Sequence, residues 1–338
     1  MKASVFYNPH DIRIEDRPDP KIEPGNILVE INSCGVCGTD KHIYEGSYPA
    51  RFPVVPGHEF AGVIVDVSPE VTKFKKGDRV SIDPNIPCGI CYFCQTGKPH
   101  FCVDNITIGQ HIDGAFAPFV SVPFSQAYNL PDNVTLDQGA MTEPVACAVH
   151  AIDRARIQLG GTAVILGAGP VGLILMQLVK AAGMGKIIVS EPKEHRRKLA
   201  LELGADIGID PNSDSVKEVV QRETQYGADL VVEAAGVAQT AQEAFGLVQP
   251  TGTILIFGAA DPKDEITIHP FDLYHNEISV IGTYVLPFTM ERSMKLIASG
   301  QVKVEPLFSH RLPIAKAQTA MDLMGSGDAV KILMDPKL

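Results

Sequence analysis

The sequence predicts an α/β protein with two domains, one rich in β-strands and one built on a doubly wound parallel sheet. Three observations carry this prediction. The 338 residues are more than one ordinary hydrophobic core accommodates. Residues 1 to about 148 consist of short β-like segments interrupted by Gly and Pro. From about residue 162, short apolar strands alternate with helical periods, which is typical of a parallel sheet.

The first region contains three segments with the apolar, β-branched composition of strands, and no long helical period appears there. These segments are residues 26–33, 61–67 and 78–82. The pattern favours a small barrel-like β domain. The last fifty residues hold a helix-like stretch, 290–299, and a final strand, 330–334, which periodicity alone assigns to neither domain.

The second region begins with a buried strand at 163–166, followed by a helix at 170–182 whose apolar residues recur on one face. The segments that follow alternate as a doubly wound sheet requires. They are strands at 186–189, 207–209, 229–233, 253–257 and 278–281, and helices at 194–203 and 215–225.

Charge and composition exclude several classes of function. The net charge of −11 argues against a nucleic-acid surface, which needs clustered Lys and Arg. The N-terminus lacks the apolar core of a signal peptide, and the longest apolar run, residues 171–179, is too short to span a bilayer. We therefore expect a cytoplasmic protein without a membrane partner. Its seven cysteines then stay reduced, which makes a disulfide framework improbable.

A glycine-rich loop lies between the strand at 163–166 and the helix that follows it. Gly167, Gly169 and Gly172 have the G-x-G-x-x-G spacing that lets a backbone approach a dinucleotide pyrophosphate at a helix N-terminus. Glu191 ends the next predicted strand, where a carboxylate accepts hydrogen bonds from ribose hydroxyls and repels a 2′-phosphate. NAD is therefore favoured over NADP, although Arg196 could bind a phosphate.

Four of the cysteines lie within fifteen residues. Cys88, Cys91, Cys94 and Cys102 have the spacing C-x2-C-x2-C-x7-C, which suits a closed tetrahedral structural zinc site. An iron–sulfur cluster is the rival interpretation, because it is also held by thiolates. A redox Cys-x-x-Cys pair is less favoured, because the loop precedes no βαβ unit.

A second set of metal-ligand side chains comes from three separate segments. They are Cys37 in CGVCGTDKH, His58 and Glu59 in GHEF, and Glu143 in TEPVACAVH. Thiolate, imidazole and carboxylate ligands with one open position are typical of a catalytic zinc. The spacing leaves open that His58 is a core histidine and Glu143 an acid at a helix start.

These motifs, in this order and at these distances, resemble the zinc-dependent medium-chain dehydrogenase/reductase (alcohol dehydrogenase) family over essentially the whole chain. The likeness is closest to the sorbitol, L-threonine and butanediol dehydrogenase branch. It implies a GroES-like catalytic domain, residues 1–148 and 285–338, and a Rossmann NAD(P)-binding domain, residues 149–284. It also implies a homotetramer or homodimer, with one catalytic and one structural zinc per chain.

The resemblance also assigns roles to single residues. It implies that Cys37, His58 and Glu143 hold the catalytic zinc, and that Glu59 ligates it or exchanges with water. Thr39 and His42 match a hydroxyl–imidazole proton relay, and Asp40 matches the residue that orients His58. The cofactor residues it implies are Gly167, Gly169, Pro170, Val171, Gly172, Glu191 and Arg196.

Several conspicuous residues receive no catalytic role. Cys34 and Cys147 match no ligand position, and we interpret them as small buried hydrophobic residues. His150 is interpreted as structural. Tyr44 and Tyr48 lie near the CGVCGTD motif, where they could contact a substrate or simply pack.

The substrate is the least determined feature. We expect oxidation of a polyol to its ketose, although the loop 282–289 carries Val285 and Leu286 where sorbitol dehydrogenases usually have an Arg–Tyr pair. L-Threonine is the alternative, because residues 190–200 look like that branch, and 2,3-butanediol comes third. A protein of another class, which binds zinc and dinucleotide without catalysis, is disfavoured by the intact set of predicted ligands and relay residues.

Overall fold

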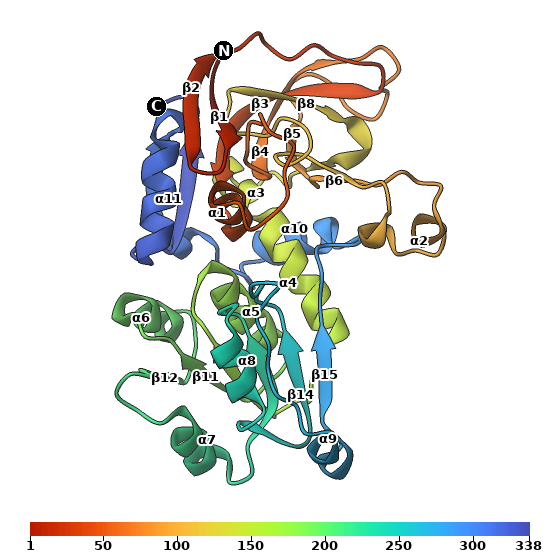
Figure 1. Cartoon of the computed structure of the whole chain (residues 1–338). Coiled ribbons are helices and arrows are strands. Elements are labelled where there is room, and N and C mark those ends of the chain that lie inside the picture. Colours follow the sequence, from red (N-terminus) through yellow and green to blue (C-terminus); the bar gives the residue numbers. More distant parts are fainter. The chain divides into compact units, whose positions relative to one another are not determined.

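The computed structural model describes all 338 residues and divides by its internal contacts into two units. Unit 1 consists of Met1–Ala146, Pro287–Ser299 and Val304–Leu338, and unit 2 of Cys147–Leu286 and Gly300–Lys303. Unit 1 is built mainly on antiparallel strands, and unit 2 on one parallel sheet (Figure 1). The predicted α/β fold class is confirmed.

Unit 1 contains a seven-stranded sheet in the order β16-β17-β3-β4-β5-β9, with β8 also paired to β3. A hairpin of β1 and β2 and a short pair of β6 and β7 complete its strands. The bounds are β1 Lys2–Asn8, β2 Asp11–Asp16, β3 Asn26–Gly35, β4 Glu59–Val67, β5 Arg79–Ile82, β6 Asn85–Ile86, β7 Ile106–Thr107, β8 Phe119–Pro123, β9 Ala127–Asn129, β16 Phe308–Pro313 and β17 Lys331–Asp335.

The C-terminal strands join the sheet formed by the N-terminal half, because β17 pairs antiparallel with β3. Leu333 faces Gly35 and Met334 faces Cys34 in this pairing. The end of the chain therefore lies against the segment that leads into the CGVCGTD motif. Sequence periodicity left this stretch unassigned, and only the long-range strand pairing assigns it to unit 1.

The helices of unit 1 are short, as the lack of a long helical period predicts. They are α1 Gly38–Glu45, α2 Tyr92–Gln95, α3 Leu136–Ala140, α10 Met290–Ala298 and α11 Ala317–Ser326, with single 3₁₀ turns at Pro99–Phe101, Phe124–Gln126, Glu305–Leu307 and Ile314–Lys316. The longer α4, Thr142–Arg154, begins in unit 1 and continues into unit 2. The segment around α2, orange in Figure 1, extends away from the sheets of unit 1.

Unit 2 is a six-stranded parallel sheet in the order β12-β11-β10-β13-β14-β15. The strands are β10 Thr162–Leu166, β11 Lys186–Ser190, β12 Ile207–Ile209, β13 Ala228–Glu233, β14 Val248–Ile256 and β15 Ser279–Gly282. The chain runs outward from β10 to β12 and then returns to the other side of β10. The strand order therefore reverses between β10 and β13, the position where such sheets bind dinucleotides.

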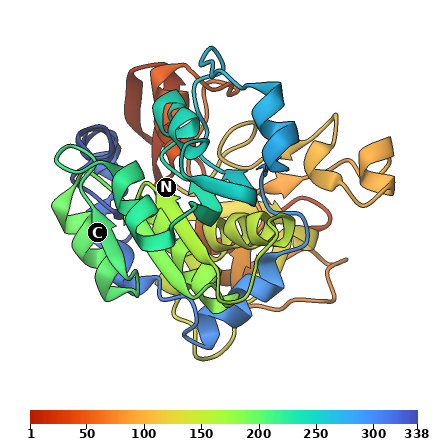
Figure 2. The same cartoon turned by 90° about the horizontal axis from the view of Figure 1, so that it is seen from below.

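The helices of unit 2 pack against the sheet, and Figure 2 shows most of them in green and teal and α9 in blue. They are α5 Pro170–Ala181, α6 Glu194–Glu202, α7 Val216–Thr224, α8 Ala238–Ala244 and α9 Pro270–Asn276. Residues 173–176 of α5 are all fully buried. None of the helices in either unit has the length and apolar character needed to cross a membrane.

The structure contains helices, α8 and α9 among them, that the sequence pattern did not indicate. Two other differences from the sequence-based prediction concern β14 and residues 300–303. β14 begins at Val248, five residues before the predicted strand. The prediction began later because Pro250 and Gly252 signal a turn. The sheet accommodates these residues with a register shift between β13 and β14 and a positive φ of 67° at Thr251. The second difference is that residues 300–303 belong to unit 2.

Residues 300–303 join unit 2 through hydrogen bonds that a sequence pattern does not reveal. The Gln177 side chain donates to the carbonyl of Lys303 at 3.2 Å and accepts from its N–H at 2.8 Å. Gln177 is 5 % exposed on α5, so its amide needs partners in the interior.

Candidate active site and cofactor site

Helix α1 positions the first candidate ligand. Cys37 is the N-cap residue of α1, and its backbone N–H donates to Oδ2 of Asp40 at 2.9 Å. The other carboxylate oxygen of Asp40 accepts the N–H of Gly57 at 3.3 Å. Asp40 is fully buried, so this carboxylate joins the start of α1 to the segment that carries His58.

The structure brings together three of the four predicted ligands of the catalytic metal. One ligand atom each from Cys37, His58 and Glu59 lies within 4.8 Å of the others. His58 is 5 % and Glu59 1 % exposed. This spacing fits side chains arranged around one ion, because zinc–ligand distances are about 2.0–2.3 Å.

The electrostatics of the cluster also favour a cation. Burial lowers the pKa of His58, but the negative charges of Cys37 and Asp40 outweigh burial and raise it well above its ordinary value. Asp40 Oδ1 lies 3.6 Å from His58 Nδ1, beyond hydrogen-bond distance, and that buried nitrogen has no hydrogen-bond partner. The donor set therefore attracts positive charge, as a site for a divalent metal must.

Glu59 has a second partner that the sequence did not indicate. The ammonium of Lys331, on β17, forms an ion pair with Glu59 Oε2 and donates to the carbonyl of Val36 at 3.0 Å. Both side chains of the pair are 2 % exposed. Burial lowers the pKa of Lys331, but the negative charges of Glu59, Cys37 and Glu143 outweigh burial. The pKa of Lys331 is therefore above its ordinary value. A Cβ at Gly35 would lie 2.8 Å from Lys331 Cε, so glycine there leaves room for the pair.

Glu143 lies outside the three-residue group. It is 7 % exposed in the first turn of α4, and its charge acts on Lys331. Its assignment as a metal ligand stays a prediction. Lys331 is thus a buried cation whose direct partner is Glu59, and the charge of Glu143 acts on it as well.

The predicted relay residues lie three positions apart on α1, which places them on one face of the helix. Thr39 Oγ1 is 3.7 Å from Cys37 Sγ, so its hydroxyl lies beside the candidate metal position. The Nδ1 atom of His42 is 3.2 Å from the hydroxyl of Ser47. Ser47 is a partner that sequence reasoning missed, because no motif marks it.

The two tyrosines near this motif differ in their surroundings. The Tyr44 ring packs against Phe6 and His10, and its hydroxyl exchanges hydrogen bonds with the Gln318 amide at 3.0 and 3.2 Å. Tyr44 is therefore held by packing. Tyr48 is 36 % exposed.

The four-cysteine lobe, residues 88–102, forms a second possible metal centre. The sulfurs of Cys88, Cys91, Cys94 and Cys102 lie within 4.8 Å of one another. Cys91 Sγ and Cys94 Sγ are 3.5 Å apart, far beyond a disulfide bond of about 2.05 Å. Two sulfurs on one tetrahedral zinc are about 3.8 Å apart, from a Zn–S distance of about 2.3 Å. The lobe therefore fits a single metal ion.

Backbone amides in the lobe favour thiolates. The N–H of Cys88 donates to Cys102 Sγ at 3.2 Å, and the N–H of Cys91 donates to Cys88 Sγ at 3.4 Å. The backbone N–H groups of Cys94 and Val103 lower the pKa of Cys91 to about 6. Burial and the neighbouring Cys91 thiol raise the pKa of Cys94, so a metal ion that binds here would displace the proton of this thiol.

The glycine loop in unit 2 has the geometry that its motif predicts. Gly167 has a φ of 100°, and a Cβ there would lie 2.9 Å from the backbone nitrogen of Ala235. A Cβ at Gly172 would collide with the carbonyl of Gly167, so glycine lets α5 approach the loop closely. Gly169 is the N-cap of α5, and a Cβ there would meet no atom within 4 Å. The loop therefore leaves open the side from which a phosphate would approach.

Glu191 is buried and forms hydrogen bonds to the backbone of the glycine loop, which the sequence does not reveal. It is 3 % exposed, and its two carboxylate oxygens accept the N–H groups of Ala168 at 2.8 Å and Lys193 at 2.9 Å. Arg197 donates to the carbonyls of Glu191 and Pro192, both at 2.7 Å. Arg197 also pairs with Asp210 at 3.0 Å, while Arg196 is half-buried on α6.

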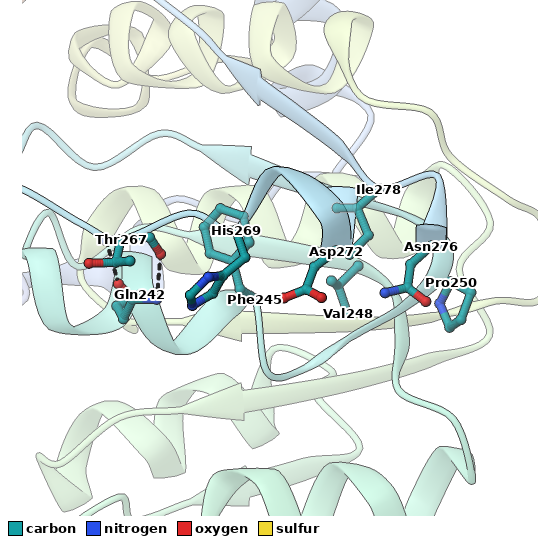
Figure 3. Close-up of a pocket in the computed structure, with 9 residues that line it drawn as sticks. All are labelled: Gln242, Phe245, Val248, Pro250, Thr267, His269, Asp272, Asn276 and Ile278. Carbon is teal, nitrogen blue, oxygen red and sulfur yellow. Dashed lines mark hydrogen bonds between the residues drawn. The ribbon is translucent and has the colours of Figure 1, made fainter. Parts of the chain in front are cut away.

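A cavity in unit 2 lies away from the glycine loop. It has a volume of about 230 Å³ and is lined by α8, the start of β14 and α9 (Figure 3). Gln242 at its rim exchanges hydrogen bonds with the backbone of Thr267. The cavity lies at the ends of β14 and β15 opposite to the glycine loop, so it belongs to a different edge of the sheet.

Predictions for the remaining cysteines have different outcomes. Cys34 is fully buried in the core of unit 1, as predicted. Cys147 is only half-buried, so the prediction of a buried hydrophobic residue is wrong there. The reason is its position on α4, where it shares a face with His150 and the exposed Arg154.

The loop after β15 contains two unusual residues. Val285 and Phe288 have positive φ values of 45° and 59°, which are rare outside glycine and especially so for a β-branched side chain. Leu286 is 1 % exposed, whereas Tyr284 and Phe288 are 49 % and 71 % exposed. The apolar character predicted for this loop is thus divided between buried and exposed side chains.

A glycine loop at the switch point of a parallel sheet and a separate cluster of thiolate, imidazole and carboxylate together define a class of protein. That class is the metal-dependent dehydrogenases, which combine a nicotinamide dinucleotide with a metal ion.

Comparisons with known families identify the class more closely. Residues 23–132 match the family described as "Alcohol dehydrogenase GroES-like domain", and residues 170–299 match "Zinc-binding dehydrogenase". The chain belongs to the zinc-dependent medium-chain alcohol dehydrogenase family, as the sequence motifs predict. It is an oxidoreductase that uses zinc and a nicotinamide dinucleotide.

Named relatives align along almost the whole chain. D-arabinitol dehydrogenase 1 of Uromyces fabae is 33 % identical over 99 % of this chain and 97 % of its own length. Sorbitol dehydrogenase of Bombyx mori is 33 % identical, covering 98 % of this chain and 97 % of its own. L-threonine 3-dehydrogenase of Pyrococcus furiosus is also 33 % identical, with 98 % and 97 % covered.

Solved structures share the same fold. A zinc-binding dehydrogenase of Sinorhizobium meliloti bound to NADP is 35 % identical, with a TM-score of 0.95 and 99 % of both chains covered. The 2R,3R-butanediol dehydrogenase of Bacillus subtilis is 29 % identical, with a TM-score of 0.91 and 99 % of both chains covered.

Proposed function

We propose that this protein oxidises a secondary alcohol of a polyol to the ketone, with NAD as the hydride acceptor. The observation that carries the proposal is the group of Cys37, His58 and Glu59, whose ligand atoms lie within 4.8 Å of one another, with His58 and Glu59 buried and Cys37 half-buried. We assign residues 1–148 and 285–338 to the catalytic domain and 149–284 to the cofactor domain.

Residues of this chain would divide the work of the reaction. Cys37 and His58 would hold the metal, with Glu59 or Glu143 as the third protein ligand. When bound, zinc supplies a Lewis acid that eases deprotonation of an alcohol oxygen, and the nicotinamide supplies the acceptor for a hydride. Thr39 accepts a hydrogen bond from the alcohol, because its hydroxyl lies beside Cys37.

His42 completes the path for the proton. Its imidazole is oriented by Ser47 and lies on the same face of α1 as Thr39. Imidazole suits a proton relay because its charge changes near neutral pH. Asp40 holds the peptide groups on either side of the cluster, which keeps Cys37 and His58 in place.

The choice of substrate rests on the relatives. Named relatives act on arabinitol and sorbitol, which supports a polyol, and the threonine and butanediol enzymes supply the alternatives. A zinc and dinucleotide-binding protein without catalysis is the alternative of another class. We disfavour it because the chain retains Thr39 and His42 together with the candidate ligands.

We also propose NAD rather than NADP. The buried Glu191 carboxylate at the end of β11 would repel a 2′-phosphate, and Arg197 is engaged with Asp210. The proposed dinucleotide residues are Gly167, Gly169, Pro170, Val171, Gly172, Glu191 and Arg196. The Sinorhizobium meliloti relative was solved with NADP bound, so the preference of this protein for NAD over NADP has to be measured directly.

The surface of the protein supports a proposal for its oligomeric state, and its cysteines support a proposal for its cellular location. We propose a homodimer or homotetramer, supported by the exposed aromatic side chains Phe271 and Tyr274 on α9 beside the uncharged edge strand β15. We propose a cytoplasmic location, because the cysteines form no disulfide bonds and five of them lie in the two candidate metal sites.

The test of the function is a substrate panel. NADH or NADPH formation is followed at 340 nm with polyols, sugars, diols and L-threonine, with NAD and NADP in parallel. We expect the highest kcat/KM with a polyol, and at least about tenfold preference for NAD, which corresponds to about 1.4 kcal/mol. Turnover that survives complete removal of metal would contradict the proposal, as would no turnover with any alcohol.

A zinc count tests the two metal sites. We expect two zinc ions per chain, and replacing Cys94 by serine should lower the count to one, because a closed tetrahedral site needs all four thiolates. Turnover should persist, because the lobe supplies no residue to the Cys37 group. Iron in place of one zinc would assign the lobe to an iron–sulfur cluster instead.

A further inference from the structure

His42, one of the two predicted relay residues, has two ring nitrogens, and the structure gives a protein partner to one of them. Its Nδ1 atom lies 3.2 Å from the hydroxyl oxygen of Ser47. His42 is half-buried and Ser47 is exposed. An imidazole accepts a proton only at the nitrogen that does not already carry one. The contact with Ser47 therefore bears on which nitrogen of His42 can act in the relay.

The backbone fixes the position of Ser47. Helix α1 ends at Gly46, whose φ of 78° lies in the left-handed region that glycine adopts readily. The turn directs the N–H groups of Ser47 and Tyr48 toward the carbonyl of His42, at 2.9 and 3.2 Å. The chain thus returns at Ser47 to the residue that its hydroxyl contacts.

The turn between β1 and β2 supports this end of α1. The N–H of His10 donates to the carbonyl of Tyr44 at 2.8 Å, and the two rings pack with their centroids 4.8 Å apart. A Cβ at Gly46 would lie 2.9 Å from Cγ of Pro9, so the turn and the helix end are in close contact. Movement of Ser47 away from the imidazole would disturb these contacts.

The single proton of the Ser47 hydroxyl has an acceptor of its own. Ser47 Oγ donates to the carbonyl of His42 at 3.3 Å. The lone pairs of this oxygen are then left to accept a hydrogen bond, and Nδ1 is the ring atom beside them. A nitrogen that donates carries a proton, so this arrangement leaves the lone pair of the neutral ring on Nε2.

We propose that Ser47 is a positioning residue for the proton relay, which holds His42 with its proton on Nδ1 so that Nε2 accepts the proton of the alcohol. This inference rests on the proposed reaction. Thr39 lies one turn earlier on the same face of α1, with its hydroxyl beside Cys37. Ser47 should therefore affect proton transfer, but not the binding of the alcohol or of the dinucleotide.

The first experiment determines the tautomer of His42 directly. The full-length protein is labelled with nitrogen-15 at histidine, and its imidazole signals are recorded by NMR at about pH 8.5, where an ordinary imidazole is neutral. The signals of His42 are identified by their absence in His42→Gln. We expect the proton on Nδ1 in the wild type, and a mixture of both tautomers in Ser47→Ala.

The second experiment measures NADH formation in a single turnover, which separates the reaction from product release. For Ser47→Ala we expect the rate to fall about tenfold, in line with the loss of one hydrogen bond to a group that becomes charged. The KM of the polyol and the Kd of NADH should change by less than about twofold. Ser47→Thr should retain most of the rate, because it keeps a hydroxyl.

Two further variants separate positioning from a general effect on the fold. Ser47→Ala combined with His42→Gln should be no slower than His42→Gln alone, because Ser47 acts only through the imidazole. Ser299→Ala is the control, since Ser299 at the end of α10 likewise donates to a backbone carbonyl, that of Leu296 at 3.1 Å. It should leave the rate and the His42 signals unchanged.

Specific results would overturn the inference. A wild-type His42 with its proton on Nε2 would do so, as would an unchanged single-turnover rate in Ser47→Ala. A double variant slower than His42→Gln would show that Ser47 acts by another route. Absence of turnover by the wild type with any alcohol contradicts the proposed function itself. The tautomer is measured without turnover, so the two failures are distinguishable.

Discussion

Replacing Cys37 by serine is expected to lower kcat at least about a thousandfold, because the metal supplies several kcal/mol of transition-state stabilisation. The Cys37 sulfur is the only thiolate in the group with His58 and Glu59. Serine is a poor ligand for zinc, so the variant should also contain one zinc ion fewer per chain. NADH should bind with unchanged affinity, because the glycine loop belongs to unit 2.

The control for this experiment is a cysteine outside both clusters. Cys147→Ser changes the same atom on α4, and it should leave turnover and zinc content at wild-type values. Near-normal turnover of Cys37→Ser, or an unchanged zinc content, would mean that the thiolate is not a ligand. Loss of NADH binding in Cys37→Ser would indicate that the substitution damages the fold.

Replacing Lys331 by methionine is expected to destabilise the metal-depleted protein by about 3–5 kcal/mol, because it leaves the buried Glu59 carboxylate without its counter-charge. Zinc should recover part of this loss, since the released carboxylate can then balance the charge of the ion. The measurement is thermal unfolding of the variant and the wild type, each with and without zinc.

A matched lysine serves as the comparison. Lys337 forms an exposed ion pair with Glu30 at 3.6 Å, and Lys337→Met should change stability by less than about 1 kcal/mol. The double variant Lys331→Met with Glu59→Gln should recover stability, because it removes both buried charges. If Lys331→Met alone is as stable as the wild type without metal, the pair does not contribute as we argue.

Local patterns were sufficient for the features that depend on neighbours in the chain. The glycine loop was predicted because the strand, the three glycines and the helix are consecutive. The four-cysteine lobe was predicted for the same reason, since its thiols lie within fifteen residues. The start of β14 was misplaced because Pro250 and Gly252 have turn propensities that strand pairing with β13 overrides.

Glu191 shows the limit of a motif. Its position at the end of β11 was predicted, but its hydrogen bonds to the N–H groups of Ala168 and Lys193 were not. A motif states which side chain is present, whereas the partner of a buried carboxylate depends on which backbone amides the fold brings near it.

The sequence by itself determined the family and the order of the strands in unit 2, and it predicted which residues hold zinc and a dinucleotide. These follow from chemistry and spacing within short segments. Only the tertiary structure decided that Lys331 would neutralise Glu59 across 272 positions of sequence. It also decided that the Glu191 carboxylate would accept the N–H of Ala168, 23 positions away. The physical reason is that a buried charge must find a partner, and strand pairing between distant segments selects that partner.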